Sequence, residues 1–138
     1  MTRPLWPLFS AILWMANSSA APTKKVAFLS TVSPGDTPRL DTLLGFALVA
    51  RSMEYETKIF FALDSALVLK QQVYEKLDGK LRDRIADCLN QGVQLDVCAA
   101  SARTFNIRKE DLIPGVELSG IANFLLFAEQ ADIQFSWA

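Results

Sequence analysis

The chain contains no histidine among its 138 residues. This absence excludes Ser-His and Cys-His nucleophile pairs, histidine-ligated metal sites and acid–base catalysis by imidazole. The six glycines stand apart from one another, so they form neither a GxGxxG nor a Walker-type phosphate loop. We therefore expect neither a nucleotide cofactor nor a metal ion.

An excess of charge is also missing. Fourteen lysines and arginines against fifteen acidic residues give a net charge of -1, so no long-range field attracts nucleic acid and we expect none to bind. Cysteine is scarce, because Cys88 and Cys98 are the only two. They are too few for a tetrahedral thiolate site, and their spacing is not that of a C-x-x-C redox pair.

Hydrophobic residues, in contrast, make up 51% of the chain and charged residues 21%. This composition is typical of a folded protein and not of a disordered one. A chain of 138 residues is long enough for one domain with a real core and too short for two comfortable ones. We therefore expect one domain.

The N-terminus has the pattern of a secretory signal peptide. Arg3 precedes an apolar run over residues 4–16, and small or polar residues follow. We expect residues 1–21 to be this signal peptide, with cleavage after Ala20, and the protein to be exported to the periplasm. The uncharged stretch continues to Thr23 and approaches the roughly 20 residues that cross a bilayer, so a retained N-terminal membrane anchor is an alternative, as is a cytoplasmic location.

The rest of the chain alternates predicted strands and helices. Residues rich in β-branched and apolar side chains predict strands at 24–32, 56–63, 93–98, 116–118 and 133–137. Apolar residues at helical spacing predict helices at 39–54, 80–91 and 101–105, a mixed helical stretch at 64–77, and a last helix with a stripe of Ile121, Phe124, Leu125, Ala128 and Ala131. This alternation predicts a single three-layer α/β domain at 24–138 with a mainly parallel sheet.

Three segments of this domain carry a family resemblance. They are KVAFLSTVSPGD, GVQLDVCAASARTFNI and EDLIPGVELSGIANFLLFAEQADIQFSW, which begin at Lys25, Gly92 and Glu110. In this order and spacing they resemble the DsrE/TusD-like (DsrE/DsrF-like) sulfur-relay family. The resemblance implies a flavodoxin-like or peroxiredoxin-like α/β fold that assembles into trimers or hexamers.

The same resemblance implies a function for one cysteine. In sulfurtransferase members of the family, a cysteine at the end of the strand after "GV" carries sulfur as a persulfide and passes it to a partner such as a TusA-like protein. The matching residue here is Cys98. The chain would then be a sulfurtransferase-like sulfur carrier. Family members that lack this activity imply an alternative, a non-catalytic binding or assembly subunit, exported or membrane-tethered.

Some residues around Cys98 would favour a reactive thiolate, and others would disfavour it. A thiol between a strand end and a helix start lies where open α/β sheets gather ligand groups, and nearby backbone N–H groups and Arg103, as an anion or partner contact, would stabilise a thiolate. Asp96 would instead disfavour the thiolate, because strand alternation places its negatively charged carboxylate on the same face as Cys98. The plainer interpretation is an ordinary buried cysteine. Cys88 shares a helix face with leucines, and we expect it to be inert core.

Other polar residues leave alternatives open. Gln94 and Asp96 interrupt a strand that should be apolar on both faces, which indicates either a pocket or subunit contact, or an edge strand with one wet face. A small-ligand cleft near residues 33–36 and 64–65 is a third hypothesis for function. Solvent access to the Cys98 sulfur would separate the first two, because an open sulfur favours the carrier and a sealed one the assembly subunit.

Overall fold

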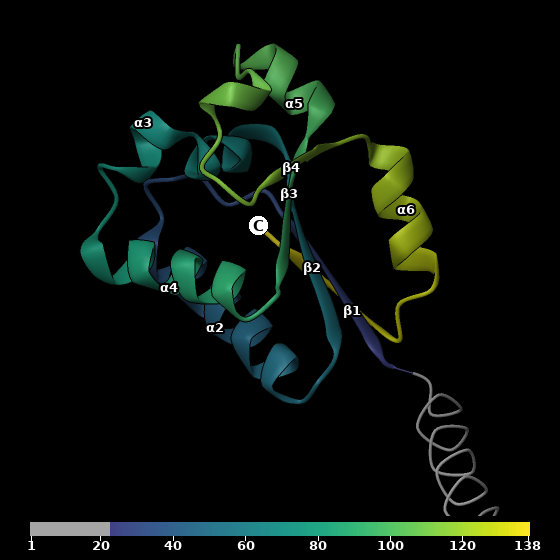
Figure 1. Ribbon diagram of the computed structural model, residues 1–138. Coiled ribbons are helices and arrows are strands. Elements are labelled where there is room, and N and C mark those ends of the chain that lie inside the picture. Colours follow the sequence, from purple (N-terminus) through teal and green to yellow (C-terminus); the bar gives the residue numbers. More distant parts are fainter. Residues whose placement is uncertain (1–22) are drawn as a thin grey trace, which may run out of the picture.

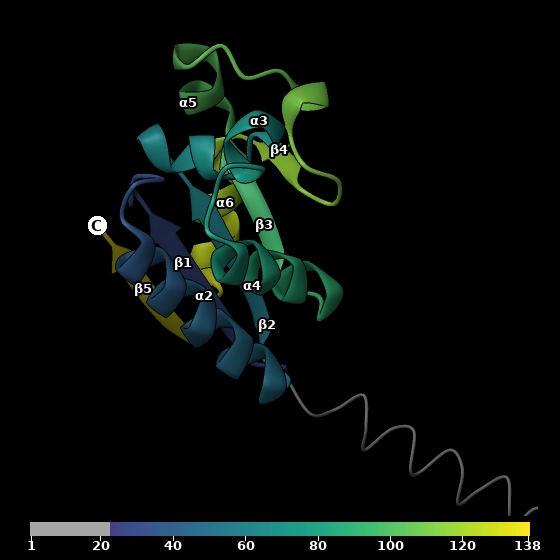
Figure 2. The same cartoon turned by 90° about the vertical axis from the view of Figure 1, so that its left-hand side faces the viewer.

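The computed structural model describes residues 23–138, so the expected signal or anchor segment lies outside the described part of the chain. The described residues form a five-stranded parallel sheet with helices on both faces (Figures 1 and 2). The predicted three-layer α/β fold is therefore confirmed. Within residues 23–138, no helix is both long and apolar enough to cross a membrane.

The strands lie where the sequence predicts them, with ends that differ by about two residues at most. They are β1 (Lys25–Ser30), β2 (Glu56–Phe61), β3 (Gln94–Cys98), β4 (Glu117–Ser119) and β5 (Ile133–Trp137). Their order in the sheet is β4-β3-β2-β1-β5, and every neighbouring pair is parallel. The last strand of the chain thus lies beside the first.

The helices divide between the two faces and one end of the sheet. They are α2 (Thr37–Ser52), α3 (Gln71–Tyr74), α4 (Gly79–Asn90), α5 (Ala99–Thr104) and α6 (Ile121–Glu129), with short 3-10 turns η1 (Leu63–Leu69) and η2 (Lys109–Asp111). Figure 1 shows α2 and α4 against one face, α6 against the other, and α5 beyond the carboxyl end of β3.

Local sequence explains the longest helix. The Asp36 carboxylate accepts a hydrogen bond from the backbone N–H of Arg39, which begins α2, and Pro38 fits the first turn because it has no N–H to leave unpaired. Apolar residues recur at helical spacing in this predicted helix, and five of them are buried against the sheet: Leu40, Leu43, Leu44, Ala47 and Ala50.

Gly92 ends α4. The Gly92 N–H donates to the carbonyl of Leu89, and the Val93 N–H donates to the carbonyl of Cys88. This is a Schellman motif, and it requires the left-handed backbone that Gly92 adopts at a φ of 88°. The chain then turns directly into β3.

The sheet has a large core on one face and a small one on the other. Under α2 and α4, side chains of all three central strands join the main core, among them Val26, Phe28, Ile59, Phe61, Leu95 and Val97. Under α6, the second cluster consists of Ala27, Phe60, Cys98, Phe124 and Phe127. The position of Cys98 in this cluster decides what surrounds its thiol.

Two expectations need correction. The stripe predicted for α6 is partly wrong, because Phe124 and Phe127 are buried while Ile121 and Leu125 are exposed. The strand that carries Asp96 is not an edge strand, because β3 lies between β2 and β4.

The polar residues of the third functional hypothesis have structural roles. Asp36 caps α2, and the buried Ser65 hydroxyl forms a hydrogen bond of 2.8 Å with the hydroxyl of Ser30. These side chains are used in holding the loops at the carboxyl end of the sheet.

Candidate functional site

Cys98 is the last residue of β3 and the residue before the first turn of α5. Parallel strands end together at the carboxyl edge of the sheet, and ligand sites of open α/β sheets lie outside this edge. The neighbouring turn is fixed by Ser101, whose hydroxyl accepts a hydrogen bond of 2.7 Å from the backbone N–H of Leu63. Cys98 therefore lies beside a turn that this hydrogen bond holds in place.

Cys98 is almost completely buried. Cys98 exposes 8% of its surface and belongs to the cluster that α6 covers. Within this cluster the rings of Phe60 and Phe124 stack with their centroids 4.7 Å apart and an interplanar angle of 20°. The surroundings of Cys98 on this side are therefore apolar and largely aromatic.

A buried ion pair lies on the same face, one pleat below Cys98. The Lys58 ammonium is 3.4 Å from the Asp96 carboxylate and 4.7 Å from the centre of the Phe127 ring. The Gln94 amide donates a hydrogen bond of 3.2 Å to the other oxygen of that carboxylate. Asp96 and Gln94 are therefore polar because they pair with each other and with Lys58, which no local pattern predicted.

The surroundings of Asp96 shift its pKa in opposite directions. Burial raises the pKa of the Asp96 carboxyl above its ordinary value, and the charge of Glu117 adds to this rise. The Lys58 ammonium and the hydrogen bond from Gln94 lower the same pKa, but burial is the larger cause. The carboxylate is consequently easier to protonate than a surface aspartate.

Cys88 lies on the opposite side of the sheet and has no exposed surface. Its thiol is within 3.8 Å of the carbonyl oxygen of Leu44, and burial raises its pKa to about 12. A thiol of this kind stays protonated at neutral pH. The prediction of an inert core cysteine is confirmed by this environment, and both cysteines are free.

Arg103 is not drawn into the cluster around Cys98. It lies in the last turn of α5 and is exposed, and within residues 23–138 its side chain makes no ion pair. Its predicted contact with an anion or a partner stays a prediction. The described residues also contain no group of three or more histidine, cysteine or acidic side chains that could hold a metal.

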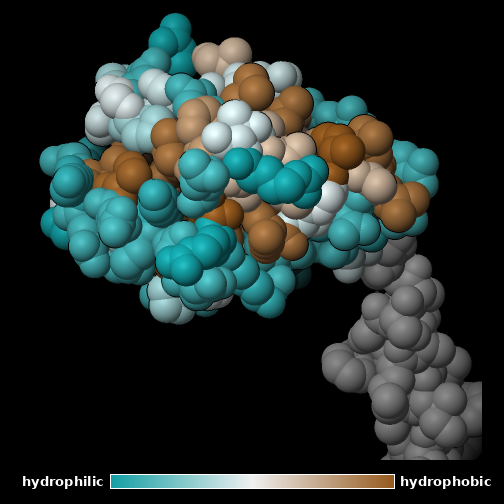
Figure 3. All heavy atoms as spheres, turned by 90° about the horizontal axis from the view of Figure 1, so that it is seen from above, coloured by the Kyte–Doolittle hydropathy of each residue, from teal (hydrophilic) through white to brown (hydrophobic). Residues whose placement is uncertain are grey.

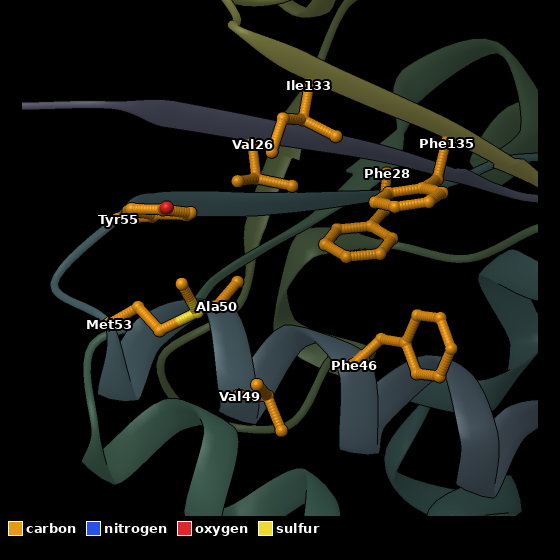
Figure 4. A pocket seen from close by; sticks show the side chains of 9 residues that line it. All are labelled: Val26, Phe28, Phe46, Val49, Ala50, Met53, Tyr55, Ile133 and Phe135. Atoms are coloured by element: carbon orange, nitrogen blue, oxygen red, sulfur yellow. The ribbon is translucent and has the colours of Figure 1, made fainter.

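Sequence reasoning missed a groove beside β5. It is a hollow of about 350 Å³ between α2 and β5, and Figure 4 shows its walls: Phe46, Val49 and Met53 from α2, and Ile133 and Phe135 from β5. Val26 and Phe28 of β1 form the floor. We call this hollow the β5 groove. Its aromatic wall is ordered, since Phe135 stacks on Phe28 at 5.1 Å and meets the edge of Phe46 at 6.2 Å.

A second apolar surface lies on the outside of α6. Ile121, Leu125 and Leu126 expose 53%, 58% and 58% of their surfaces. We call these three side chains the α6 ridge. Hydrophobic side chains also gather on the side of the molecule that carries α6 in the view from above (brown in Figure 3). A helix that is apolar on both its inner and outer sides is typical of a buried helix.

Comparison of the chain with known protein families identifies its family. The model of the DsrE/DsrF-like family matches residues 24–136, which is nearly the whole described chain. This chain belongs to that family. The resemblance expected from the sequence is thereby confirmed, including the segment that carries Cys98.

Relatives in sequence are found among archaea. The chain is 30% identical over 124 residues to an uncharacterized protein of Methanocaldococcus jannaschii, a match that covers 86% of this chain and 45% of that protein. The chain thus spans about half the length of that relative. An uncharacterized protein of Methanopyrus kandleri is 26% identical over 100 residues, which cover 72% of this chain and 83% of the relative.

Solved structures confirm the fold. The ychN protein of E. coli superposes with a TM-score of 0.74 at 17% identity, covering 83% of this chain and all of that one, 100%. A protein of unknown function from Methanobacterium thermoautotrophicum gives a TM-score of 0.61 at 17% identity, with 83% and 99% covered. At this identity the likeness concerns the fold alone.

Proposed function

We propose that this chain is a sulfur carrier of a sulfur-relay system and that Cys98 holds the transferred sulfur as a persulfide. The observation that carries the proposal is the position of Cys98 at the carboxyl end of β3, directly before α5, in a chain of the DsrE/DsrF-like family. Cys88 is unsuited to this role, because it is fully buried and its pKa is raised to about 12.

The transfer step is a thiol exchange. The Cys98 thiolate attacks the outer sulfur of a donor persulfide, a new S–S bond forms at Cys98, and the S–S bond of the donor breaks to release the donor thiolate. The proton of the Cys98 thiol passes to that thiolate. An acceptor thiolate then removes the outer sulfur in the same manner, so the cycle needs no external oxidant or metal.

The acceptor we propose is a small carrier protein of the TusA-like kind. It would approach the carboxyl edge of the sheet, where Cys98 and the exposed Arg103 both lie on or beside α5. An arginine at this rim would attract an acidic surface or a persulfide anion. For a protein exported across a membrane, donor and acceptor would have to share its compartment.

One observation favours the alternative, a non-catalytic binding or assembly subunit. Cys98 exposes only 8% of its surface, and a sealed sulfur is what the assembly role predicts. In that case the fold serves to present the β5 groove and the α6 ridge to other chains. The carrier role instead requires α6 or α5 to shift when a donor docks.

The two functions differ in one measurement. Wild-type protein, C98S and C88S are incubated with polysulfide, and intact mass with and without reductant reports loading. The carrier proposal expects the wild type and C88S to gain the mass of one reductant-labile sulfur atom and C98S to gain none. Buried Cys88→Ser should instead lower the free energy of unfolding by about 1–3 kcal/mol, because it leaves a hydroxyl in an apolar site.

Thermal melting of the same three proteins provides the control. C98S should lose less stability than C88S, because Cys98 lies at a strand end and keeps 8% of its surface exposed. A cooperative melt above the loading temperature then shows that its failure to load is not due to unfolding. Loading of C98S, or no loading of the wild type, would remove the carrier function and leave the assembly subunit.

A further inference from the structure

A buried pair of opposite charges lies on the sheet face that carries Cys98. The Lys58 ammonium is 3.4 Å from the Asp96 carboxylate, and the two residues expose only 8% and 1% of their surfaces. A buried ion pair adds little to stability, because the loss of hydration of both charges offsets their attraction. Stability of the fold therefore does not account for a lysine and an aspartate at these positions.

The ammonium is displaced along the sheet toward the cysteine. Lys58 lies opposite Gln94 in the register of β2 and β3, but its ammonium contacts Asp96, two residues nearer the carboxyl end of β3. Cys98 follows Asp96 on the same face. At about 3.3 Å per strand residue, roughly 7 Å separates the Cα atoms of Asp96 and Cys98. The three side chains thus form one row on the face that α6 covers (Figure 1).

Lys58 is the one buried cation among residues 23–138. Charged groups on the other elements around Asp96 are exposed or partly exposed: Lys25 on β1, Glu117 on β4, Arg103 on α5 and Glu129 on α6. Of these, Lys25 pairs with Glu56, and Glu117 lies opposite Asp96 and adds negative charge to its surroundings. Because solvent screens exposed charges more than buried ones, Lys58 is the cation that acts most strongly on this row.

Loading of Cys98 with sulfur adds a second acid to the row. A persulfide is a stronger acid than a thiol, and its outer sulfur is negatively charged once the proton has left. Two anions at neighbouring positions of a largely buried strand face repel each other, and one cation does not neutralise both. Burial already raises the pKa of the Asp96 carboxyl, so this carboxylate is readily neutralised by a proton.

We propose that Lys58 is the counter-ion of two acids in turn, the Asp96 carboxylate in the empty carrier and the Cys98 persulfide anion in the loaded one, and that loading takes up one proton at Asp96. This inference rests on the proposed sulfur-carrier function. Lys58 and Asp96 are positioning residues here, because they act on the charge of the persulfide and not on the donor.

The step balances without an oxidant. A donor persulfide anion gives its outer sulfur to Cys98, so the S–S bond of the donor breaks as the S–S bond at Cys98 forms. The proton of the Cys98 thiol passes to the donor thiolate. A second proton, from water, neutralises the Asp96 carboxylate, and the Lys58 ammonium then balances the persulfide anion.

This coupling gives loading a defined dependence on pH. The persulfide anion raises the pKa of Asp96, so at low pH the carboxyl is protonated in both forms and does not affect loading. As the pH rises, the empty carrier releases this proton first, and loading weakens. At high pH the carboxylate is ionised in both forms, and the full repulsion between the two anions remains.

The test measures loading of the full chain by glutathione persulfide at a fixed ratio to glutathione, over a series of pH values, with intact mass as the readout. The loading constant of D96N divided by that of the wild type should be near one at low pH. It should rise with pH to a plateau of roughly 10- to 100-fold. E117Q is the matched control, because it removes a carboxylate from an exposed position of the same face, and its ratio should change little.

A second variant isolates the role of the lysine. K58M/D96N removes both charges, and removal of both partners of a buried pair usually leaves a folded protein. It should load less than D96N, because the persulfide anion has lost its cation. Thermal melting of every variant reports folding. If D96N does not melt cooperatively, K58M/D96N is compared with the wild type, and its loading should fall less steeply as the pH rises.

The outcomes separate this inference from the function on which it rests. A wild type that never loads sulfur would remove the carrier function itself. If the wild type loads, a D96N ratio that does not change with pH, or equal loading of D96N and K58M/D96N, would overturn the inference and leave the carrier function in place. Parallel pH profiles of K58M/D96N and the wild type would overturn it as well.

Discussion

Asp96 shows how a single residue couples the fold to pH. Its carboxyl is buried beside Lys58, and burial raises its pKa above the ordinary value of 3.8. In the unfolded chain the carboxyl titrates near that ordinary value, so between the two pKa values the folded protein binds the extra proton. Stability from this group is present at low pH and is lost as the pH rises through the folded pKa.

We therefore expect D96N to remove a fall in the free energy of unfolding that the wild type shows as pH rises from about 4. K58M should extend that fall to higher pH, because the cation that holds the carboxylate ionised is gone. Each unit by which the pKa is raised contributes about 1.4 kcal/mol to the fall. Denaturant unfolding at a series of pH values measures the free energy of unfolding. Identical pH profiles for the wild type and D96N would contradict the expectation.

The residues of the site differ in how far the sequence predicts their positions. That Asp96 and Cys98 share a face follows from strand alternation alone, because side chains two residues apart point the same way. Lys58 could not be paired with Asp96 in advance, because this contact depends on the register between β2 and β3, which places Lys58 opposite Gln94. Register is a property of the assembled sheet.

Among the elements, α6 supplies two of the side chains that surround Cys98, Phe124 and Phe127. Phe124 is buried against Phe60 and is part of the cluster that holds the thiol. We expect F124A to lower the free energy of unfolding by about 3 kcal/mol and to speed the native-state alkylation of Cys98 by iodoacetamide. Peptide mass mapping after timed labelling measures this rate, and Cys88 serves as the internal sealed thiol.

F124L is the conservative comparison. Leucine keeps apolar cover over the cluster, so stability should fall by less than in F124A and labelling of Cys98 should stay near the wild-type rate. Equal labelling of Cys98 in F124A and the wild type would mean that the thiol is reached by another route, through α5.

The elements themselves were predictable, because each has a local period that matches its structure. Strands rich in apolar residues and the Leu40 to Ala50 stripe of α2 were placed correctly for this reason. The buried side of α6 was predicted only in part, because a helix that is apolar on nearly every side has no distinct apolar stripe. The groove could not be foreseen either, because it arises from the placement of β5 beside β1, which no local pattern contains.

For the whole molecule, the N-terminal segment bears on where the mature chain begins. The N-terminal pattern, with Arg3 before the apolar run at 4–16 and small residues after it, is that of a signal peptide. We propose export with cleavage after Ala20. N-terminal sequencing of protein from the native host should give Ala21 as the first residue, because short side chains before the cut fit the peptidase.

Recovery of Met1 from a membrane fraction would favour the anchor instead, and recovery of Met1 from the soluble cytoplasm would remove export altogether. Cleavage at Ala20 would leave the described domain intact, because β1 begins at Lys25.

The sheet order bears on how the chain is made. Of the five described strands, β1 comes first along the chain and its neighbour β5 comes fifth, and the two pair from Val26 with Ile133 to Ser30 with Trp137. While the chain emerges, β1 can pair with β2 but keeps its other edge unpaired until β5 has been synthesised. Completion of this sheet therefore waits for β5, and during that interval the unpaired edge of β1 is most exposed to wrong pairing, which is the situation that chaperones relieve.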